Sequence, residues 1–469
     1  MATAPTLTLE NIRQMIVGID KKVPLYDGRH VQYINFDNAA STPILKPVLD
    51  KINEFMGWYS SVHRGTGFKS QISTLMHEKS REIVARFVNV DLEEHTIIFG
   101  KNATEAINKL AHRILLQPDQ VILCSKMEHH SNDLPWRTRT RVVHVDIDDK
   151  GRLIEEDLIA NLEKYRGRVA LFAITGASNV TGWVNDVHRL AEICHGYGVQ
   201  IMVDAAQWVP HRKVDMRPQD DPGHIDFLAF SAHKIYAPLG AGVLIGDKSA
   251  FGQGEPDMVG GGTVHIVSLD HTYWADVPEK EEAGSPNTVG IVALAKALLV
   301  MEELGMDNIA AHEAHLTTYM LRRMKEIPQA SIYGGDDPYD VENRMGVVSF
   351  NVEGLPHELV AAILNHEGGI GVRNGCFCAH PYIKCLLRVS EEDARLLEEN
   401  ILKRDRTTIP GAVRASFGIY NTEEEIDVFI DVLKRIARRE WKGEYQQDFH
   451  TGEYHLKGYN PDYGNYFRL

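Results

Sequence analysis

The sequence predicts an α/β protein: a large α/β domain followed by a smaller α+β domain. Short apolar runs alternate with amphipathic helical patterns, as in a sheet that is covered on both faces. This alternation stops near residue 295, after which longer helices and fewer strands are predicted. The chain has 469 residues, 43% of them hydrophobic and 25% charged, which is enough for more than one domain core.

Buried strands are predicted where the apolar runs occur, at 121–124, 169–174, 199–203, 227–230 and 242–246. Two helices are predicted where apolar residues recur at three- and four-residue steps, one over Val187, Leu190, Cys194 and Tyr197 and an earlier one over Ile83, Val84, Phe87 and Val88. A further strand at 96–100, a tight turn and a helix starting near Ala103 precede the first of these runs.

The second half predicts a helix over 289–304, a strand over 345–350, a helix near 358–365 and a last helix over 423–439. We therefore expect a large domain over 21–295, a small domain formed by 1–20 with 296–440, and a C-terminal extension over 441–469. The extension carries five tyrosines without a clear period. We expect an extended arm that wraps a surface, with disorder as the alternative because Gly, Asn and Asp are frequent there.

Composition excludes several classes of function. The net charge is −15 and there is no basic block, which argues against broad binding to nucleic acid or to an anionic membrane. No stretch approaches the ~18 apolar residues of a membrane span, and the N-terminus has no apolar signal region. Five clustered cysteines are too few for a disulfide framework. We expect a cytoplasmic enzyme of a reducing compartment.

Two residues at the ends of predicted strands point to a cofactor. Lys234 follows the apolar run 227–230, and Asp204 follows 199–203; the carboxyl ends of such strands are where open α/β sheets place ligands. Alone, a lysine is most often a surface charge and an acid here is often a helix cap. Together they match pyridoxal 5′-phosphate, which needs a lysine for its Schiff base and a carboxylate for its ring nitrogen.

The cofactor hypothesis requires further groups, and the sequence contains candidates. Its phosphate needs backbone N–H groups at a helix start and hydroxyl donors, as offered by Ala103 and Thr104. Ser231 and His233, which flank Lys234, are further candidates for the phosphate. Capping alone would also explain a threonine at a helix start. His129 follows the strand 121–124 and is placed to cover the cofactor ring. No Cys/His spacing elsewhere favours zinc, so no metal site is predicted.

Taken in order, a series of blocks resembles the class V aminotransferase family, fold type I pyridoxal-phosphate enzymes, and within it the cysteine desulfurases and selenocysteine lyases. The blocks are NFDNAASTP (35–43), VHRG (62–65), KNATE (101–105), MEHH (127–130), SNVTG (178–182), DAAQ (204–207), SAHK (231–234), AGSPN (283–287), RNGCFCAHP (373–381) and VRASFGIYNT (413–422). The resemblance implies a fold type I transferase whose large domain has a mixed, mostly parallel sheet.

The resemblance also implies roles for individual residues. Lys234 matches the Schiff-base lysine, Asp204 the partner of the pyridine nitrogen, and His129 the stacking histidine. Other cofactor contacts implied are Asn179 and Gln207 to the ring oxygen, and Ala103, Thr104, Ser231 and His233 to the phosphate. Ser285 matches a hydroxyl that reaches the phosphate from the second subunit, which implies a homodimer. Arg414 matches the arginine that pairs with the substrate carboxylate, and Arg373 and Asn38 are further candidates for substrate binding.

The desulfurases of this group carry a nucleophilic cysteine at the position of Cys378. Its thiolate would take sulfur from cysteine, leaving a persulfide and releasing alanine, and Arg373 would favour the thiolate. A buried core cysteine is the alternative. Two features depart from the family. Cys376 stands where a histidine is frequent, so it could relay sulfur, form a disulfide or simply pack. Gly67 replaces another histidine, so that Phe68 and Lys69 would line the substrate entrance differently.

We therefore expect a cysteine desulfurase or selenocysteine lyase that acts on a small cysteine-like substrate, with a possible sulfur-acceptor protein and with no nucleic-acid or membrane partner. A C–S lyase that forms pyruvate and ammonia by β-elimination needs no cysteine and stays open. An aminotransferase or epimerase is a weaker choice. A scaffold protein without catalysis is disfavoured, because it would not need both Lys234 and Asp204.

Overall fold

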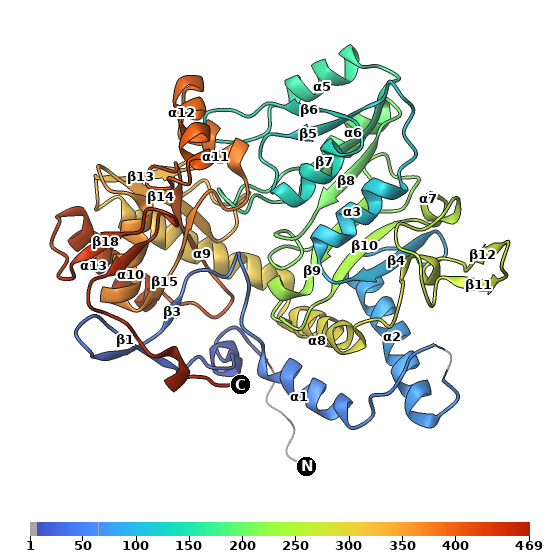
Figure 1. The fold of residues 1–469 in the computed structure, drawn as a ribbon, viewed down its shortest axis with the longest axis horizontal. Helices are drawn as coiled ribbons and strands as arrows, with labels where there is room; N and C mark the ends of the chain where they lie inside the picture. The colour runs from blue at the N-terminus through green and yellow to red at the C-terminus, as the bar shows by residue number, and fades with distance from the viewer. Residues whose placement is uncertain (1–6, 64) are drawn as a thin grey trace.

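A seven-stranded sheet forms the centre of the larger lobe in this computed structural model, which describes residues 7–63 and 65–469 (Figure 1). Its strand order is β4-β10-β9-β8-β7-β5-β6. Neighbouring strands from β9 to β6 are parallel, whereas β10 is antiparallel to β9 and β4. The bounds are β4 (His95–Gly100), β5 (Val121–Ser125), β6 (Arg141–Val145), β7 (Val169–Thr175), β8 (Gln200–Asp204), β9 (Phe227–Ser231) and β10 (Gly242–Asp247). The predicted mixed, mostly parallel sheet is confirmed.

The predicted strands of this sheet are confirmed within one or two residues. Every residue of β5 and β9 is buried, and so are four of the five in β8. Such uniformly apolar strands suit a parallel sheet covered on both faces. The covering helices and neighbours are α1 (Lys46–Met56), α2 (Phe68–Phe87), α3 (Ala103–Arg113), α4 (Leu134–Arg137), α5 (Glu155–Lys164), α6 (Val187–Gly196), α7 (Lys248–Gly252) and α8 (Thr288–Leu304).

Helix α8 is mostly apolar and packs inside the larger lobe, against α1 and α2. Asn287 caps it by accepting a 3.0 Å hydrogen bond from the amide of Gly290. At Gly290 a Cβ atom would lie 1.8 Å from the carbonyl oxygen of Gly240. Glycine is therefore required for α8 to approach the loop before β10, which follows the segment that carries Lys234.

The smaller lobe contains a four-stranded antiparallel sheet, β13-β14-β17-β16. Its strands are β13 (Ala330–Tyr333), β14 (Val347–Val352), β16 (Arg373–Gly375) and β17 (Ala412–Ser416), and its helices are α9 (Met306–Met324), α10 (His357–Gly368), α11 (His380–Leu386), α12 (Glu391–Leu402) and α13 (Glu423–Ala437). The strand predicted at 345–350 begins at Val347, because the amide of Met345 donates instead to Gly182 of the other lobe at 2.8 Å.

The N-terminal segment packs into both lobes. Ile12 and Ile16 belong to the core of the larger lobe, whereas Ile34 and Phe36 belong to the core of the smaller lobe. Strand β3 (Ile34–Asn35) pairs in parallel with β15 (Ile370–Gly371). The chain returns to the larger lobe between Phe36 and Ala39, and Ala39 borders the cavity described below.

The C-terminal extension lies on the smaller lobe, beside the N-terminal strands at the lower left of Figure 1. Its strands β18 (Tyr445–Gln447) and β19 (Tyr454–Leu456) form an antiparallel pair. Tyr445 and Tyr454 pack against the core of the smaller lobe, and the hydroxyl of Tyr459 donates to the carbonyl of Pro24 at 3.3 Å. These contacts correspond to the expected arm.

The remaining elements are short. They are β1 (Lys22–Pro24), β2 (His30–Gln32), β11 (Val264–Val267), β12 (Thr272–Trp274) and the 3₁₀ turns η1 (Ile12–Met15), η2 (His130–Asn132), η3 (Ala232–Lys234), η4 (Glu279–Glu281) and η5 (Tyr463–Asn465). Within residues 7–63 and 65–469, no helix has the length and apolar content needed to cross a membrane.

Candidate active site

A cavity of about 300 Å³ lies where the carboxyl ends of the parallel strands face the smaller lobe. Strand β8 brings Asp204 to it, β9 brings Ser231, and the turn η3 brings Lys234. Strands β16 and β17 of the smaller lobe contribute Arg373 and Arg414 from the opposite side. Of the predicted site residues, the structure brings together Ala103, Thr104, His129, Asn179, Asp204, Gln207, Ser231, His233, Lys234, Arg373, Cys378 and Arg414.

Asp204 and Lys234 both line this cavity, and the charge of each acts on the pKa of the other. Asp204 is 4% exposed, and burial raises the pKa of its carboxyl group, against the opposing charge of Lys234. Burial lowers the pKa of Lys234 to about 8, although Asp204 opposes that shift. About half of the amine is therefore neutral at pH 8 and available as a nucleophile.

The N-terminus of α3 forms one wall of the cavity. The side chain of Asn102 caps the helix through the amide of Glu105 at 3.0 Å, and the amide of Ala103 donates to Ser231 Oγ at 2.7 Å. A Cβ atom at Gly242 in β10 would lie 2.4 Å from the backbone of Asn102. Glycine thus lets the helix start lie directly on the sheet, where its amides and positive dipole end favour an anionic group.

His129 lies between this helix start and Lys234. Its Nδ1 accepts a 3.1 Å hydrogen bond from the amide of Ser131, so the neutral ring carries its proton on Nε2. Burial and the charge of Lys234 lower the pKa of His129 to about 3, and the same causes lower that of His233 to about 4. Both rings are therefore neutral at physiological pH.

Glu128, next to His129, is a buried carboxyl group to which the sequence analysis assigned no role. Burial raises its pKa to about 8, although hydrogen bonds from Asn132 Nδ2 (2.7 Å) and the amide of Thr175 (2.9 Å) oppose the shift. A direct hydrogen bond also joins it to Ser125. Glu128 thereby ties the end of β5 to β7 beneath the His129 loop.

Arg414 is 3% exposed and points its guanidinium group into the cavity. One nitrogen donates to the carbonyl of Asn179 and another to Asp37 Oδ1, both at 3.0 Å. Its Nε is buried without a hydrogen-bond partner among the described residues. Asp37 also lies 3.8 Å from Arg373, so this carboxylate sits between two arginines. The arrangement leaves positive charge free to bind a further carboxylate.

Cys378 lies in a loop whose backbone is held in an unfavourable conformation. Phe377 and Cys378 have φ values of 52° and 55°, in the left-handed region that non-glycine residues rarely adopt. The carbonyl of Phe377 accepts a 2.9 Å hydrogen bond from Asn179, and the ring of Phe377 lies under the guanidinium group of Arg414 at 5.0 Å. These contacts hold the exposed Cys378 thiol at the cavity.

Cys376 faces away from this cavity. Its thiol donates to the carbonyl of Pro410 at 3.0 Å, and burial raises its pKa to about 11. It is not among the described residues that line the cavity. Of the three roles left open for Cys376, this geometry favours packing.

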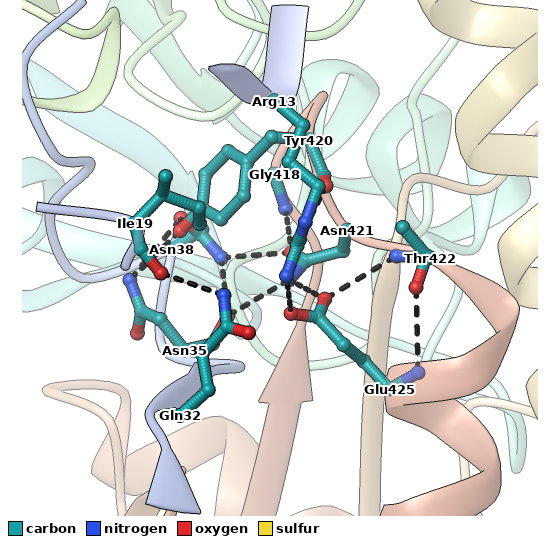
Figure 2. A network of polar contacts seen from close by, with 10 residues as sticks. All are labelled: Arg13, Ile19, Gln32, Asn35, Asn38, Gly418, Tyr420, Asn421, Thr422 and Glu425. Atoms are coloured by element: carbon teal, nitrogen blue, oxygen red, sulfur yellow. Dashed lines mark hydrogen bonds and ion pairs between the residues drawn. The ribbon is translucent and has the colours of Figure 1, made fainter. Parts of the chain in front are cut away.

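Asn38 is placed in a buried polar network behind the cavity, shown in Figure 2, rather than on its lining. Its amide nitrogen donates to Asn35 O at 2.9 Å, Ser416 O at 3.1 Å and Asn421 Oδ1 at 3.2 Å, and its oxygen accepts from the hydroxyl of Tyr420 at 2.8 Å. With its amide group engaged in this way, Asn38 holds the adjoining loop, whose Ala39 and Ala40 do line the cavity.

Three further predicted residues lie outside the cavity of this single chain. Ser285 is exposed, as are Phe68 and Lys69, and none of them lines the cavity. Lys69 donates to the carbonyl of Gly57 at 2.9 Å. Arg64, in the same segment, lies outside the described residues.

Several lining residues were not assigned a role from the sequence, namely Asn102, Ser131, Thr175, Asn374 and Phe377. Ser131 Oγ lies 2.7 Å from Thr104 Oγ1 and 3.0 Å from His129 Nδ1, so Ser131 links these two predicted residues of the site. Ser131 could have been found from the sequence because its hydroxyl directly follows the pair His129-His130. Asn374 and Phe377 could have been found from their place in the block that contains Cys378.

Comparison with known proteins places this chain in one family with its relatives. The family model "Aminotransferase class-V" matches residues 34–429. A "Probable cysteine desulfurase" of Pyrococcus abyssi is 34% identical over 430 residues, covering 90% of this chain and 97% of the relative. A "Cysteine desulfurase" of Dickeya dadantii is 36% identical over 423 residues, covering 88% and 93%. The solved apo structure of a cysteine desulfurase from Thermococcus onnurineus is 33% identical, with a TM-score of 0.77, covering 94% of this chain and all of that one.

Proposed function

Because this chain belongs to the class V aminotransferase family, we propose that it is a pyridoxal-phosphate-dependent cysteine desulfurase that converts cysteine to alanine and carries the sulfur on Cys378. The observation that carries the proposal is the convergence of Lys234, Asp204 and the exposed Cys378 thiol on one cavity. The names of relatives that match nearly the whole chain support the same activity.

The cavity suits pyridoxal phosphate. The amide of Ala103 and the hydroxyls of Thr104 and Ser231 would hold the phosphate at the start of α3, where a Cβ at Gly242 would disturb the close packing. Asp204 would face the ring nitrogen, His129 the ring, and Lys234 the aldehyde. Asn179, Gln207 and His233 are the remaining candidate contacts, and Gln207 Oε1 is buried without a partner among the described residues.

When bound, pyridoxal phosphate supplies an electron sink for the bonds of the substrate's α-carbon. Asp204 would hold the ring nitrogen protonated, and its burial would strengthen that interaction. Lys234 Nζ, with a pKa near 8 in the free site, is suited to take a proton from the α-carbon and to return one. Arg414, which lines the cavity, would pair with the substrate carboxylate.

Cys378 performs the sulfur transfer. Its thiolate attacks the sulfur of the substrate, an S–S bond forms, and the Cβ–S bond breaks. The electron pair of the broken bond stays on the three-carbon fragment, which gains protons and leaves as alanine. Arg373 and Arg414 line the same cavity as Cys378.

The position of Ser285 bears on the assembly. It is exposed on this chain and does not line the chain's own cavity. We propose that it reaches the phosphate site of a second copy, so that a homodimer completes two sites. The exposed position of Cys378 leaves its persulfide open to a sulfur-acceptor protein, and the five free cysteines of the structure suit a reducing compartment.

Product analysis tests the activity. The purified enzyme is incubated with cysteine, and alanine, pyruvate and ammonia are measured alongside the mass of the protein. Desulfuration gives one alanine for each sulfur transferred from cysteine and a one-sulfur adduct on Cys378. Pyruvate and ammonia without alanine, and no adduct, would instead establish β-elimination.

A further inference from the structure

A cluster of two histidines and one aspartate lies at the amino ends of the central strands, on the side of the sheet opposite to the cavity that contains Lys234. His195, in the last turn of α6, and His224, in the loop before β9, both face Asp226, which directly precedes β9. One ligand atom from each residue lies within 4.8 Å of the others. Strand β9 separates the cluster from Ser231, five residues or roughly 16 Å away. The cluster is therefore distinct from the cavity that contains Lys234.

Backbone carbonyls determine which ring nitrogens are free. His195 Nδ1 lies 2.7 Å from the carbonyl oxygen of Pro222, and His224 Nδ1 lies 2.7 Å from that of Asp221. A carbonyl oxygen can only accept, so each Nδ1 carries a proton and donates it. In the neutral rings the lone pair is then on Nε2, the orientation in which histidine binds a metal.

Both Nε2 atoms point at the carboxylate of Asp226. The distance is 2.9 Å from His195 Nε2 to Oδ2 and 3.6 Å from His224 Nε2 to Oδ1. Nitrogen lone pairs and carboxylate oxygens are all acceptors, so this approach needs positive charge between them. Protons on both rings would place two cations with centroids 4.1 Å apart in a stacked arrangement, where they repel. A proton on His195 alone would leave the lone pair of His224 Nε2 facing the carboxylate at 3.6 Å.

From this geometry we propose that His195, His224 and Asp226 form a binding site for a divalent first-row transition metal ion, with zinc as the favoured ion. One divalent cation satisfies both lone pairs and the carboxylate and removes the like-charge contact. Two imidazoles and one carboxylate are ligands that zinc commonly takes. Ligand atoms about 2.1 Å from a tetrahedral zinc ion lie about 3.4 Å apart, which the separations of 2.9 and 3.6 Å bracket.

The groups around the cluster fit a metal site. The Asp226 carboxylate is oriented by the amide of Ile201 at 2.8 Å and by Gln200 Nε2 at 3.2 Å. The side chains of His195 and His224 are each 18% exposed, and that of Asp226 is 11% exposed, so an ion can reach them. A cavity of about 210 Å³ beside His224 and Asp226 offers space for a water molecule as fourth ligand.

The expected consequence is structural. An ion here would join the end of α6 and the loop before β9 to the amino ends of two central strands, which carry Asp204 and Ser231 at their other ends. Binding to the folded chain alone raises thermal stability. The inference does not rest on the proposed desulfurase activity.

Zinc titration of the metal-free holoenzyme tests the site. Calorimetry and thermal melting are compared for the wild type, His224→Gln and Asp226→Asn. We expect the wild type to bind one more equivalent of zinc than either variant, and zinc to raise its Tm by several degrees with no such rise in the variants. Zinc bound by the exposed thiols of Cys378 and Cys385 is common to all three proteins and cancels in the comparison.

His315→Gln is the matched control, because His315 is an exposed histidine paired with a single carboxylate on another helix, Glu423, at 2.8 Å. It should bind zinc as the wild type does. Asp226 also accepts backbone and side-chain hydrogen bonds, so His224→Gln, which changes one loop side chain, decides the matter if Asp226→Asn fails to fold. Equal zinc stoichiometry and equal Tm shifts in the wild type and His224→Gln would show that protons alone occupy the cluster.

Discussion

The backbone amide of His130 donates a 2.7 Å hydrogen bond to the carbonyl oxygen of Cys378. This bond joins the loop after β5, which carries His129, to the loop of the smaller lobe that carries the proposed nucleophile. The amide of His380 adds a second link, to His130 Nε2 at 3.3 Å. The thiol is thus positioned by the same backbone segment that positions the ring over the proposed cofactor.

The first prediction compares the two cysteines. Cys378→Ala should bind cofactor and cysteine but form no alanine, because no thiol at the cavity can take the sulfur. Cys376→Ala should keep part of its activity, since its thiol is bonded to Pro410 and points away. Alanine formation and protein mass are measured after cysteine is added. Selenocysteine could still react with Cys378→Ala, because selenium leaves more easily. Full pyruvate production by Cys378→Ala would contradict the prediction.

The second prediction concerns Lys234→Ala. Without the amine at the base of the cavity, the protein should trap no cofactor on borohydride reduction and should have essentially no turnover. Absorbance after reduction and dialysis measures the trapped cofactor. Lys164→Ala, at an exposed lysine on α5, is the control and should behave as the wild type. Near-normal activity in Lys234→Ala would remove the cofactor assignment.

The third prediction is a pH dependence. The neutral amine is the nucleophile that attaches to the aldehyde, and burial lowers the pKa of Lys234 from an ordinary 10.5 to about 8. The rate at which apoprotein takes up pyridoxal phosphate should therefore rise with pH up to about 8 and then level off. The same reaction is measured with Nα-acetyllysine, whose side-chain amine is free, and it corrects for titration of the cofactor itself. An uptake rate that still rises at pH 10 would mean that burial does not lower the pKa of Lys234.

The fourth prediction is that Asp204→Asn slows turnover at least about tenfold and weakens cofactor binding. The variant keeps the shape of the side chain but loses the charge, and a charge-assisted hydrogen bond contributes about 1.5–3 kcal/mol. Cofactor affinity by fluorescence and the rate constant for alanine formation are measured together. An unchanged rate constant would place Asp204 outside the reaction.

The fifth prediction is that Arg414→Lys raises KM for cysteine at least about tenfold. Lysine supplies a point charge but no planar fork, and it cannot contact Asn179, Asp37 and a substrate carboxylate together. Each charge-assisted bond lost is worth about 1.5–3 kcal/mol, or a factor of about ten or more. Cofactor content serves as the control and should be unchanged. A KM within twofold of the wild type would assign the carboxylate to another group.

The strands and the residues at their carboxyl ends could be predicted because they depend on short-range pattern. Apolar runs such as that of β9 are buried whole, and a parallel sheet brings all their carboxyl ends to one edge. Lys234 and Asp204 could therefore be assigned to one site from the sequence alone. The block that contains Cys378 could be recognised in the same way, as a local sequence motif.

Side-chain direction could not be predicted, because it depends on contacts between segments far apart in the chain. Cys376 and Cys378 are two residues apart, yet one thiol is bonded to Pro410 and the other lies at the cavity, because left-handed backbone at Phe377 and Cys378 turns the chain between them. Asn38 is taken up by a network that reaches Ser416 and Asn421. Its neighbours line the cavity in its place.

The sequence by itself determined the α/β class, the family and the amino acids available for the chemistry, because these follow from periodicity and from ordered local motifs. The tertiary structure alone decided the protonation and pairing of those residues. The low pKa of His129 and the raised pKa of Glu128 both arise from burial. His195, His224 and Asp226 lie together because the end of α6 and the loop before β9 pack at the amino ends of the central strands. Burial and long-range packing are properties of the folded chain, since they exist only when distant segments exclude water together.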